Sequence, residues 1–161
     1  MISIKICIDQ YLAEYCIGKY NFGDKSTPVK FPTSDDLYHL LWQLMRKRPQ
    51  CHSPIDEGNL EISLGSDNHR GKNPEVYNYL DEKSIRIIEC KIKALFYMEL
   101  HERIIDNIMK GKPKTTTEIV HFFMCDYEID SISEDALIKN NYRLRQATNK
   151  RKKRTYRKLV K

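Results

Sequence analysis

The chain contains few of the residues that mark specialised protein classes. Glycine and proline number six each among 161 residues, which is too few for a fibrous or linker-rich protein. No apolar run approaches the roughly 20 residues that a membrane-spanning helix requires. The first eight residues alternate apolar and polar side chains instead of forming the apolar segment of a signal peptide. We therefore expect a soluble protein that is not exported and has no membrane partner.

Cysteines are few and widely spaced. The five residues, at positions 7, 16, 51, 90 and 125, are odd in number, and no two lie closer than nine residues apart. This spacing matches neither a disulfide framework nor a C-x-x-C metal site. It favours reduced cysteines that serve as small apolar side chains, as is usual in the cytoplasm. We expect a cytoplasmic protein without a metal or other cofactor.

The sequence also has no recognised catalytic pattern. Its five histidines do not pair with Cys, His or carboxylates at metal-ligand spacing. No G-x-S-x-G or H-E-x-x-H motif is present. Glu99 and Glu102 flank an apolar helical stripe, where we expect them at its solvent edge. The sequence therefore favours a protein that is not an enzyme.

Acidic residues are absent from the C-terminal end of the chain. The last 26 residues, 136–161, carry eleven Lys and Arg and no Asp or Glu. Removing these eleven from the 28 basic residues leaves 17 against 22 acidic ones, a net charge of −5. Such separation of charge predicts contact with a polyanion, of which nucleic acid is the most common.

The hydrophobic pattern predicts an α+β fold that is mostly helical. Hydrophobic residues make up 40% of the chain and sixteen residues are aromatic, enough for a core. Period-two alternation predicts strands at 2–8 and 59–64, with a short edge strand between prolines at 28–32. Helices are expected at 10–20, 34–48 and 74–110, the last with a possible break at 80–81.

A pair of helices follows, with the length and spacing of a helix-turn-helix. Thr115 and Glu118 form a capping box that opens a helix through Tyr127, with Phe122 and Phe123 facing inward. A turn of about five residues leads to a second helix over 133–146, capped by Ser133. An ordinary helical hairpin is the alternative. We divide the chain into a small α+β region (1–73), a helical region with this pair (74–149) and a basic tail (150–161).

The second helix and the tail contain the candidate binding residues. Polar side chains that can contact base edges or sugar in duplex DNA are Lys139, Asn140, Arg143 and Gln146. Those expected to contact phosphates are Arg145, Lys150, Arg151, Lys152, Lys153, Arg154, Arg157 and Lys158.

Other interpretations stay open at this point. The tail alone also fits a structural or protein-interaction module that binds RNA or an acidic partner, with strand 2–8 as a pairing edge. The helix after residue 81 is either the central helix of the fold or the contact between two copies in a homodimer. The loop 68–72 is a polar turn or, less in keeping with known motifs, a phosphate site.

Four segments, 10–20, 31–41, 77–89 and 132–143, resemble small uncharacterised proteins of phages and conjugative elements in Bacteroides-type gut bacteria. The resemblance implies a mobile-element setting, in which small basic DNA-binding accessory proteins are common. It implies no catalytic residue. The sequence thus predicts a non-catalytic accessory or regulatory protein that binds duplex DNA.

Overall fold

The computed structural model of the protein describes residues 2–49, 57–65 and 71–159, with side chains described up to Ala147. It confirms an α+β fold that is mostly helical. Its elements, in chain order, are β1 (Ile2–Ile6), α1 (Gln10–Asn21), α2 (Asp36–Leu44), β2 (Leu60–Gly65), α3 (Glu82–Met109), α4 (Thr116–Asp126) and α5 (Glu134–Leu159).

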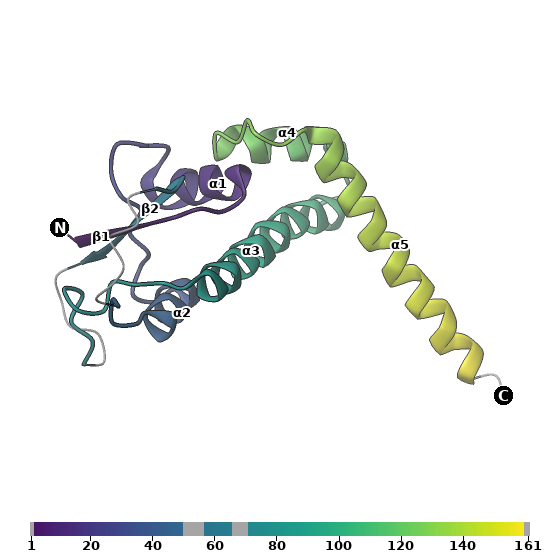
Figure 1. Cartoon of the computed structure of the whole chain (residues 1–161). Coiled ribbons are helices and arrows are strands. Elements are labelled where there is room, and N and C mark those ends of the chain that lie inside the picture. The colour runs from purple at the N-terminus through teal and green to yellow at the C-terminus, as the bar shows by residue number, and fades with distance from the viewer. Residues whose placement is uncertain (1, 50–56, 66–70, 160–161) are drawn as a thin grey trace.

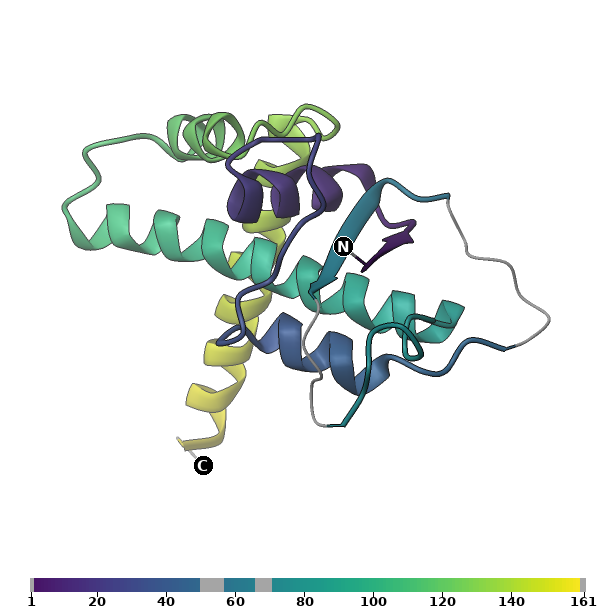
Figure 2. The same ribbon diagram turned by 90° about the vertical axis from the view of Figure 1, so that its left-hand side faces the viewer.

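Helix α3 lies at the centre of the molecule. Helices α1 and α4 lie along one side of it, and α2 lies along the other (Figures 1 and 2). Its buried residues recur every fourth position from Ile88 to Ile104, so the stripe drifts around the helix and meets several neighbours in turn. A single hydrophobic core extends from Ile4 to Leu137. The small α+β region and the helices therefore share one core.

Strands β1 and β2 form an antiparallel pair in which Ile4 lies opposite Ile62. The alternating apolar residues of β1 are confirmed as its inward face, although the strand ends at Ile6. The strand expected at 28–32 is wrong, because this segment contributes a single bridge to β2. Val29 donates its N–H to Glu61 O (2.8 Å) and accepts from Ser63 N (2.9 Å). The flanking prolines have no N–H to extend the pairing.

Helix α2 ends at Leu44, four residues before the predicted end. Arg46 leaves the helix and pairs with Tyr79 through two backbone hydrogen bonds of 3.0 and 3.3 Å. The ammonium group of Lys72 donates to the carbonyl oxygens of Trp42 (2.6 Å) and Met45 (2.9 Å). Lys72 thus satisfies free carbonyl groups at the helix C-terminus. It is engaged there and does not serve the phosphate site considered for loop 68–72, whose residues 68–70 lie outside the described ones.

Residues 80–81 are not helical, as the possible break there predicted, but no helix directly precedes them, so the predicted helical start at Pro74 is wrong. Tyr77 N donates to Asn73 O (2.8 Å) in a single turn, after which the chain extends. Helix α3 begins only after Asp81, whose carboxylate accepts from Ser84 N at 2.8 Å. Its 28 residues span about 42 Å. The buried stripe makes α3 the central helix of this fold.

Helices α4 and α5 begin as the sequence predicts. The capping box of Thr115 and Glu118 is present at the start of α4, and Ser133 Oγ accepts from Ala136 N at 3.3 Å. Phe122 was expected to face inward, but 47% of its surface is exposed. The ammonium of Lys114 lies 4.2 Å from the centre of its ring, a cation–π contact available at the surface.

Helix α1 holds the connection between α4 and α5. The Glu14 carboxylate accepts from Asp130 N (3.0 Å), Ser131 N (3.1 Å) and Ser131 Oγ (2.8 Å). Burial opposes ionisation of Glu14, but these hydrogen bonds outweigh it and lower its pKa. Contacts with α1 therefore hold the connection from which α5 begins.

We expect Gly18→Ala to lower the free energy of unfolding by about 1–3 kcal/mol. A Cβ atom at Gly18 would lie 2.5 Å from Tyr127 O and 2.7 Å from Tyr127 Cα, and no side-chain rotation relieves contacts with backbone. Helix propensity alone would favour alanine by about 1 kcal/mol.

The control is Ala94→Gly, at an exposed position of α3. It should cost about 1 kcal/mol through propensity. Urea unfolding of both variants measures the changes. A stabilised Gly18→Ala variant would show that the two segments do not approach this closely.

Glu99 lies in a polar cluster between α1, α3 and α4, so its expected place at the solvent edge is wrong. Its carboxylate accepts from Tyr15 Oη (2.7 Å) and Lys19 Nζ (2.8 Å), and also from the hydroxyl of Tyr127. Arg103 lies 3.4 Å from its second oxygen. Burial opposes the ionised carboxylate, but hydrogen bonds from Lys19, Tyr127 and Tyr15 prevail and lower its pKa.

The pKa values of the two tyrosines in this cluster, Tyr15 and Tyr127, shift upward, opposite to that of Glu99. Burial and the hydrogen bond to Glu99 raise the pKa of Tyr127 to about 12. Burial likewise raises the pKa of Tyr15. Each hydroxyl therefore stays protonated and remains a donor to the carboxylate.

Candidate nucleic-acid interface

Helix α5 is one continuous helix that projects from the body. It was expected to end near Gln146, with a separate tail beginning at residue 150. Instead it runs from Glu134 to Leu159, about 39 Å, and its C-terminal end lies far from the other elements (Figures 1 and 2). No Gly or Pro occurs after Pro113, and Lys and Arg are good helix formers. The basic segment therefore continues the helix backbone.

The predicted base-contacting residues lie on the first part of α5. Lys139, Arg143 and Gln146 are exposed, and Asn140 is half-buried. Lys139 and Arg143 form no ion pair with any carboxylate of the described residues. Both cations are therefore available to an external anion.

The predicted phosphate contacts divide into two groups. Arg145 is exposed, and it too forms no ion pair within the described part of the chain. The others lie on helical backbone, but their side chains lie outside the described ones: Lys150, Arg151, Lys152, Lys153, Arg154, Arg157 and Lys158.

The α4–α5 pair differs from a helix-turn-helix in its connection and its packing. Seven residues, 127–133, separate the helices, whereas a helix-turn-helix uses three or four. Leu137 and Asn141 are buried against the body, but residues 142–147 are all exposed. Only the first two turns of α5 therefore bury residues against the body, and the next six residues, 142–147, are exposed, with Arg145 beside the connection between α3 and α4.

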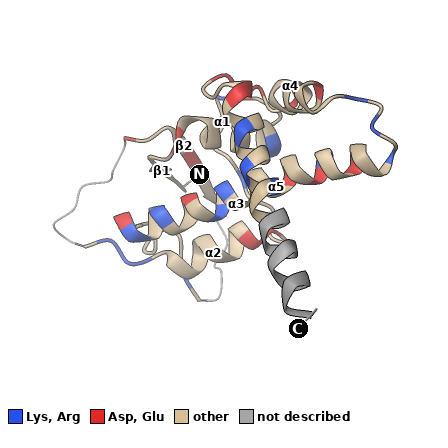
Figure 3. Ribbon diagram, turned by 90° about the vertical axis from the view of Figure 1, so that its right-hand side faces the viewer, with Lys and Arg blue, Asp and Glu red and all other residues tan. Residues whose placement is uncertain are grey.

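A second group of cations lies beside the first part of α5. Lys110, Lys112 and Lys114 occupy the end of α3 and its connection to α4, which is blue in Figure 3. Arg145 lines a groove of about 340 Å³ together with Lys112 and Lys114. Sequence reasoning missed these lysines, although the spacing Lys110-x-Lys112-x-Lys114 was a visible signal. The structure brings Lys112 and Lys114 together with one predicted phosphate contact, Arg145.

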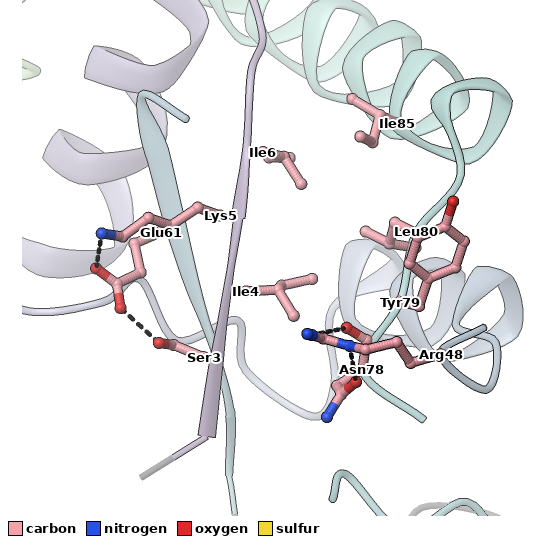
Figure 4. A pocket seen from close by; sticks show the side chains of 10 residues that line it. All are labelled: Ser3, Ile4, Lys5, Ile6, Arg48, Glu61, Asn78, Tyr79, Leu80 and Ile85. Atoms are coloured by element: carbon pink, nitrogen blue, oxygen red, sulfur yellow. Dashed lines mark hydrogen bonds and ion pairs between the residues drawn. The ribbon is translucent and has the colours of Figure 1, made fainter. Parts of the chain in front are cut away.

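A separate small cavity lies between β1 and the start of α3 (Figure 4). Its volume is about 150 Å³, below the roughly 300–1,000 Å³ of most ligand pockets. Ile4 and Ile6 line it on one side, and Arg48 at its edge donates to Asn78 Oδ1 at 3.1 Å. Its lining includes no residue of α5. This cavity is therefore separate from the basic surface.

Neither a metal centre nor a membrane span is found in the part of the chain that the structure describes. Its His, Cys, Asp and Glu residues form no group of three or more with the arrangement of metal ligands. None of its helices combines the length and apolar character needed to cross a bilayer.

Comparison with protein-family models, with curated proteins and with solved structures finds no match to this chain.

Proposed function

We propose that this chain is a non-catalytic protein that binds nucleic acid, with duplex DNA as its ligand. The observation that carries the proposal is α5, a helix with no acidic residue after Asp135, whose cations Lys139, Arg143 and Arg145 form no ion pair with any described residue. It projects from residues 1–133, which hold 17 basic and 20 acidic residues, a net charge of −3. An acidic body repels phosphates, so binding is directed to α5. Because the sequence resembles phage and conjugative-element proteins, we also propose that the protein has an accessory or regulatory role on a mobile element. Its proposed location is the cytoplasm.

Helix geometry favours binding in the major groove. At 3.6 residues per turn, positions 139, 143, 150, 154 and 157 fall within about 60° of one another around the helix axis. All five are Lys or Arg. The major groove of B-DNA admits a single α-helix, and basic-region proteins insert a continuous helix there. This mode suits a projecting helix whose residues 142–147 are all exposed better than docking as the second helix of a helix-turn-helix.

The lysines beside α5 extend the proposed contact surface. Lys112 and Lys114 share the groove with Arg145, close to where α5 leaves the body. A duplex lying along α5 would pass this groove, so the lysines are placed to contact an adjacent phosphate. Contacts at two places would orient the body on the duplex, while Lys139, Arg143 and Gln146 face base edges or sugar.

Titration with three nucleic acids tests the proposal. Fluorescence anisotropy should show that the whole chain binds a 30-base-pair duplex at least about tenfold more tightly than single-stranded DNA or a structured RNA of equal charge, because only the duplex has a wide major groove. Equal weak binding to all three, abolished at modest salt, would contradict it. That outcome would favour the protein-interaction module, with α5 bound to an acidic partner.

A further inference from the structure

Cys125 lies next to a histidine that a carboxylate orients. The sequence has no recognised catalytic pattern, yet a thiol and an imidazole base come together where α4 meets α5. Cys125 Sγ lies 3.6 Å from His121 Nε2, one helical turn back on α4. His121 Nδ1 lies 2.7 Å from Glu134 Oε1, at the start of α5. Cys125 is exposed to solvent.

The carboxylate determines which ring nitrogen carries the proton. Nδ1 donates its hydrogen to Glu134, because the carboxylate can only accept. In the neutral imidazole Nε2 then has a free lone pair, and this atom faces the thiol. The three side chains thus have the order of an activated nucleophile: a thiol, a base that can take its proton, and a group that holds the base in the correct tautomer.

We propose that Cys125 is a nucleophilic thiol that undergoes thiol–disulfide exchange with small disulfides. His121 Nε2 takes the thiol proton, and the thiolate sulfur attacks one sulfur of the disulfide. A new S–S bond to Cys125 forms as the original S–S bond breaks. The leaving thiolate takes a proton from the imidazolium. Cys125 is oxidised to a mixed disulfide, and the other half of the small disulfide is reduced to a thiol.

Exposure alone does not account for the expected selectivity, since Cys7 and Cys90 are also exposed. Neither of these two has a hydrogen-bonding histidine among the described residues. The other charged groups near this thiol are the carboxylates of Glu118, Asp126, Glu128 and Asp135, and the guanidinium of Arg103 on α3, which pairs with Asp126. Activation of Cys125 therefore depends on His121.

The test treats the whole reduced chain with oxidised glutathione at pH 7 and follows each cysteine by peptide mass spectrometry. Cys125 should form the mixed disulfide at least about tenfold faster than Cys7 and Cys90. His121→Ala should remove this difference. Glu134→Gln should reduce it several-fold, because the base loses its orienting group. Circular dichroism checks that each variant remains folded.

A measurement at pH 10 separates activation from accessibility. Ordinary thiols are then ionised without a base, so the advantage of Cys125 should fall to about twofold or less. Equal rates for the three cysteines at pH 7, or an advantage that persists in His121→Ala, would overturn the proposal. An advantage that is unchanged at pH 10 would do the same.

Discussion

A chain that ends at Ala147 is expected to bind duplex DNA at least about a hundredfold more weakly than the whole chain near 100 mM salt. The truncation removes eight of the eleven cations in the last 26 residues. Each phosphate contact releases a bound counterion, and six to ten such contacts change affinity by about 10³–10⁵ between 50 and 200 mM salt. The loss should be the same for every DNA sequence, because phosphate contacts carry no sequence information.

A full-length variant separates charge from length. In this control the seven Lys and Arg at positions 150–158 become Gln, which is also a good helix former. It should lose as much affinity as the truncated chain. The described core ends at Leu137, so both proteins should keep the thermal unfolding midpoint of the whole chain. Undiminished binding by the Gln variant would show that these cations do not contact DNA.

Glu99→Leu is expected to lower the free energy of unfolding by about 2–4 kcal/mol. Removing one partner of a buried ion pair typically costs about 3–5 kcal/mol, and this cluster is only partly buried. The Glu99 side chain is 20% exposed, and those of Lys19 and Arg103 are 32% exposed. The change removes the shared acceptor of both cations and of two tyrosine hydroxyl groups, while Arg103 keeps its ion pair with Asp126.

The matched control is Glu102→Leu, three residues later on α3 at an exposed position. It should change the free energy of unfolding by no more than about 0.5 kcal/mol. Urea unfolding at pH 7 compares the two variants. Equal, small effects would mean that Glu99 is solvated in solution and that the polar cluster does not hold α1, α3 and α4 together.

The effect of Glu99 should also depend on pH in a defined direction. Its pKa in the folded protein is below the ordinary value of 4.5. Stability from the ionised carboxylate is therefore fully present above that value and is lost as pH falls through the folded-state pKa. The difference between the native chain and Glu99→Gln should be constant above pH 5.5 and shrink below about pH 4. A difference that grows on acidification would contradict the lowered pKa.

Features that depend on neighbouring residues were predictable from the sequence. The capping box at Thr115, the Ser133 cap and the absence of helix at 80–81 are confirmed, because each rests on side chains within three positions of the backbone that they cap. The inward face of β1 follows from its period of two. The caps at Thr115 and Ser133 also predicted where α4 and α5 begin.

Contacts between distant segments were not predictable. Glu99 meets Lys19 and Tyr15, which precede it by 80 and 84 residues, and a single sequence contains no signal of such pairing. The same holds for His121 and Glu134, which come together only because the connection folds α5 back beside α4. The lack of Gly and Pro after Pro113 indicated that α5 could be continuous. The run of like charges, however, favoured an unstructured tail.

The salt dependence of DNA binding tests the central claim most directly. The measurement is the slope of log K against log salt concentration for the whole chain and for the chain ending at Ala147. If α5 contacts six or more phosphates, the slope for the whole chain should be about −5 or steeper, and the truncated chain should have a slope of about −2 or flatter. Two indistinguishable slopes would show that the projecting basic helix does not hold the DNA.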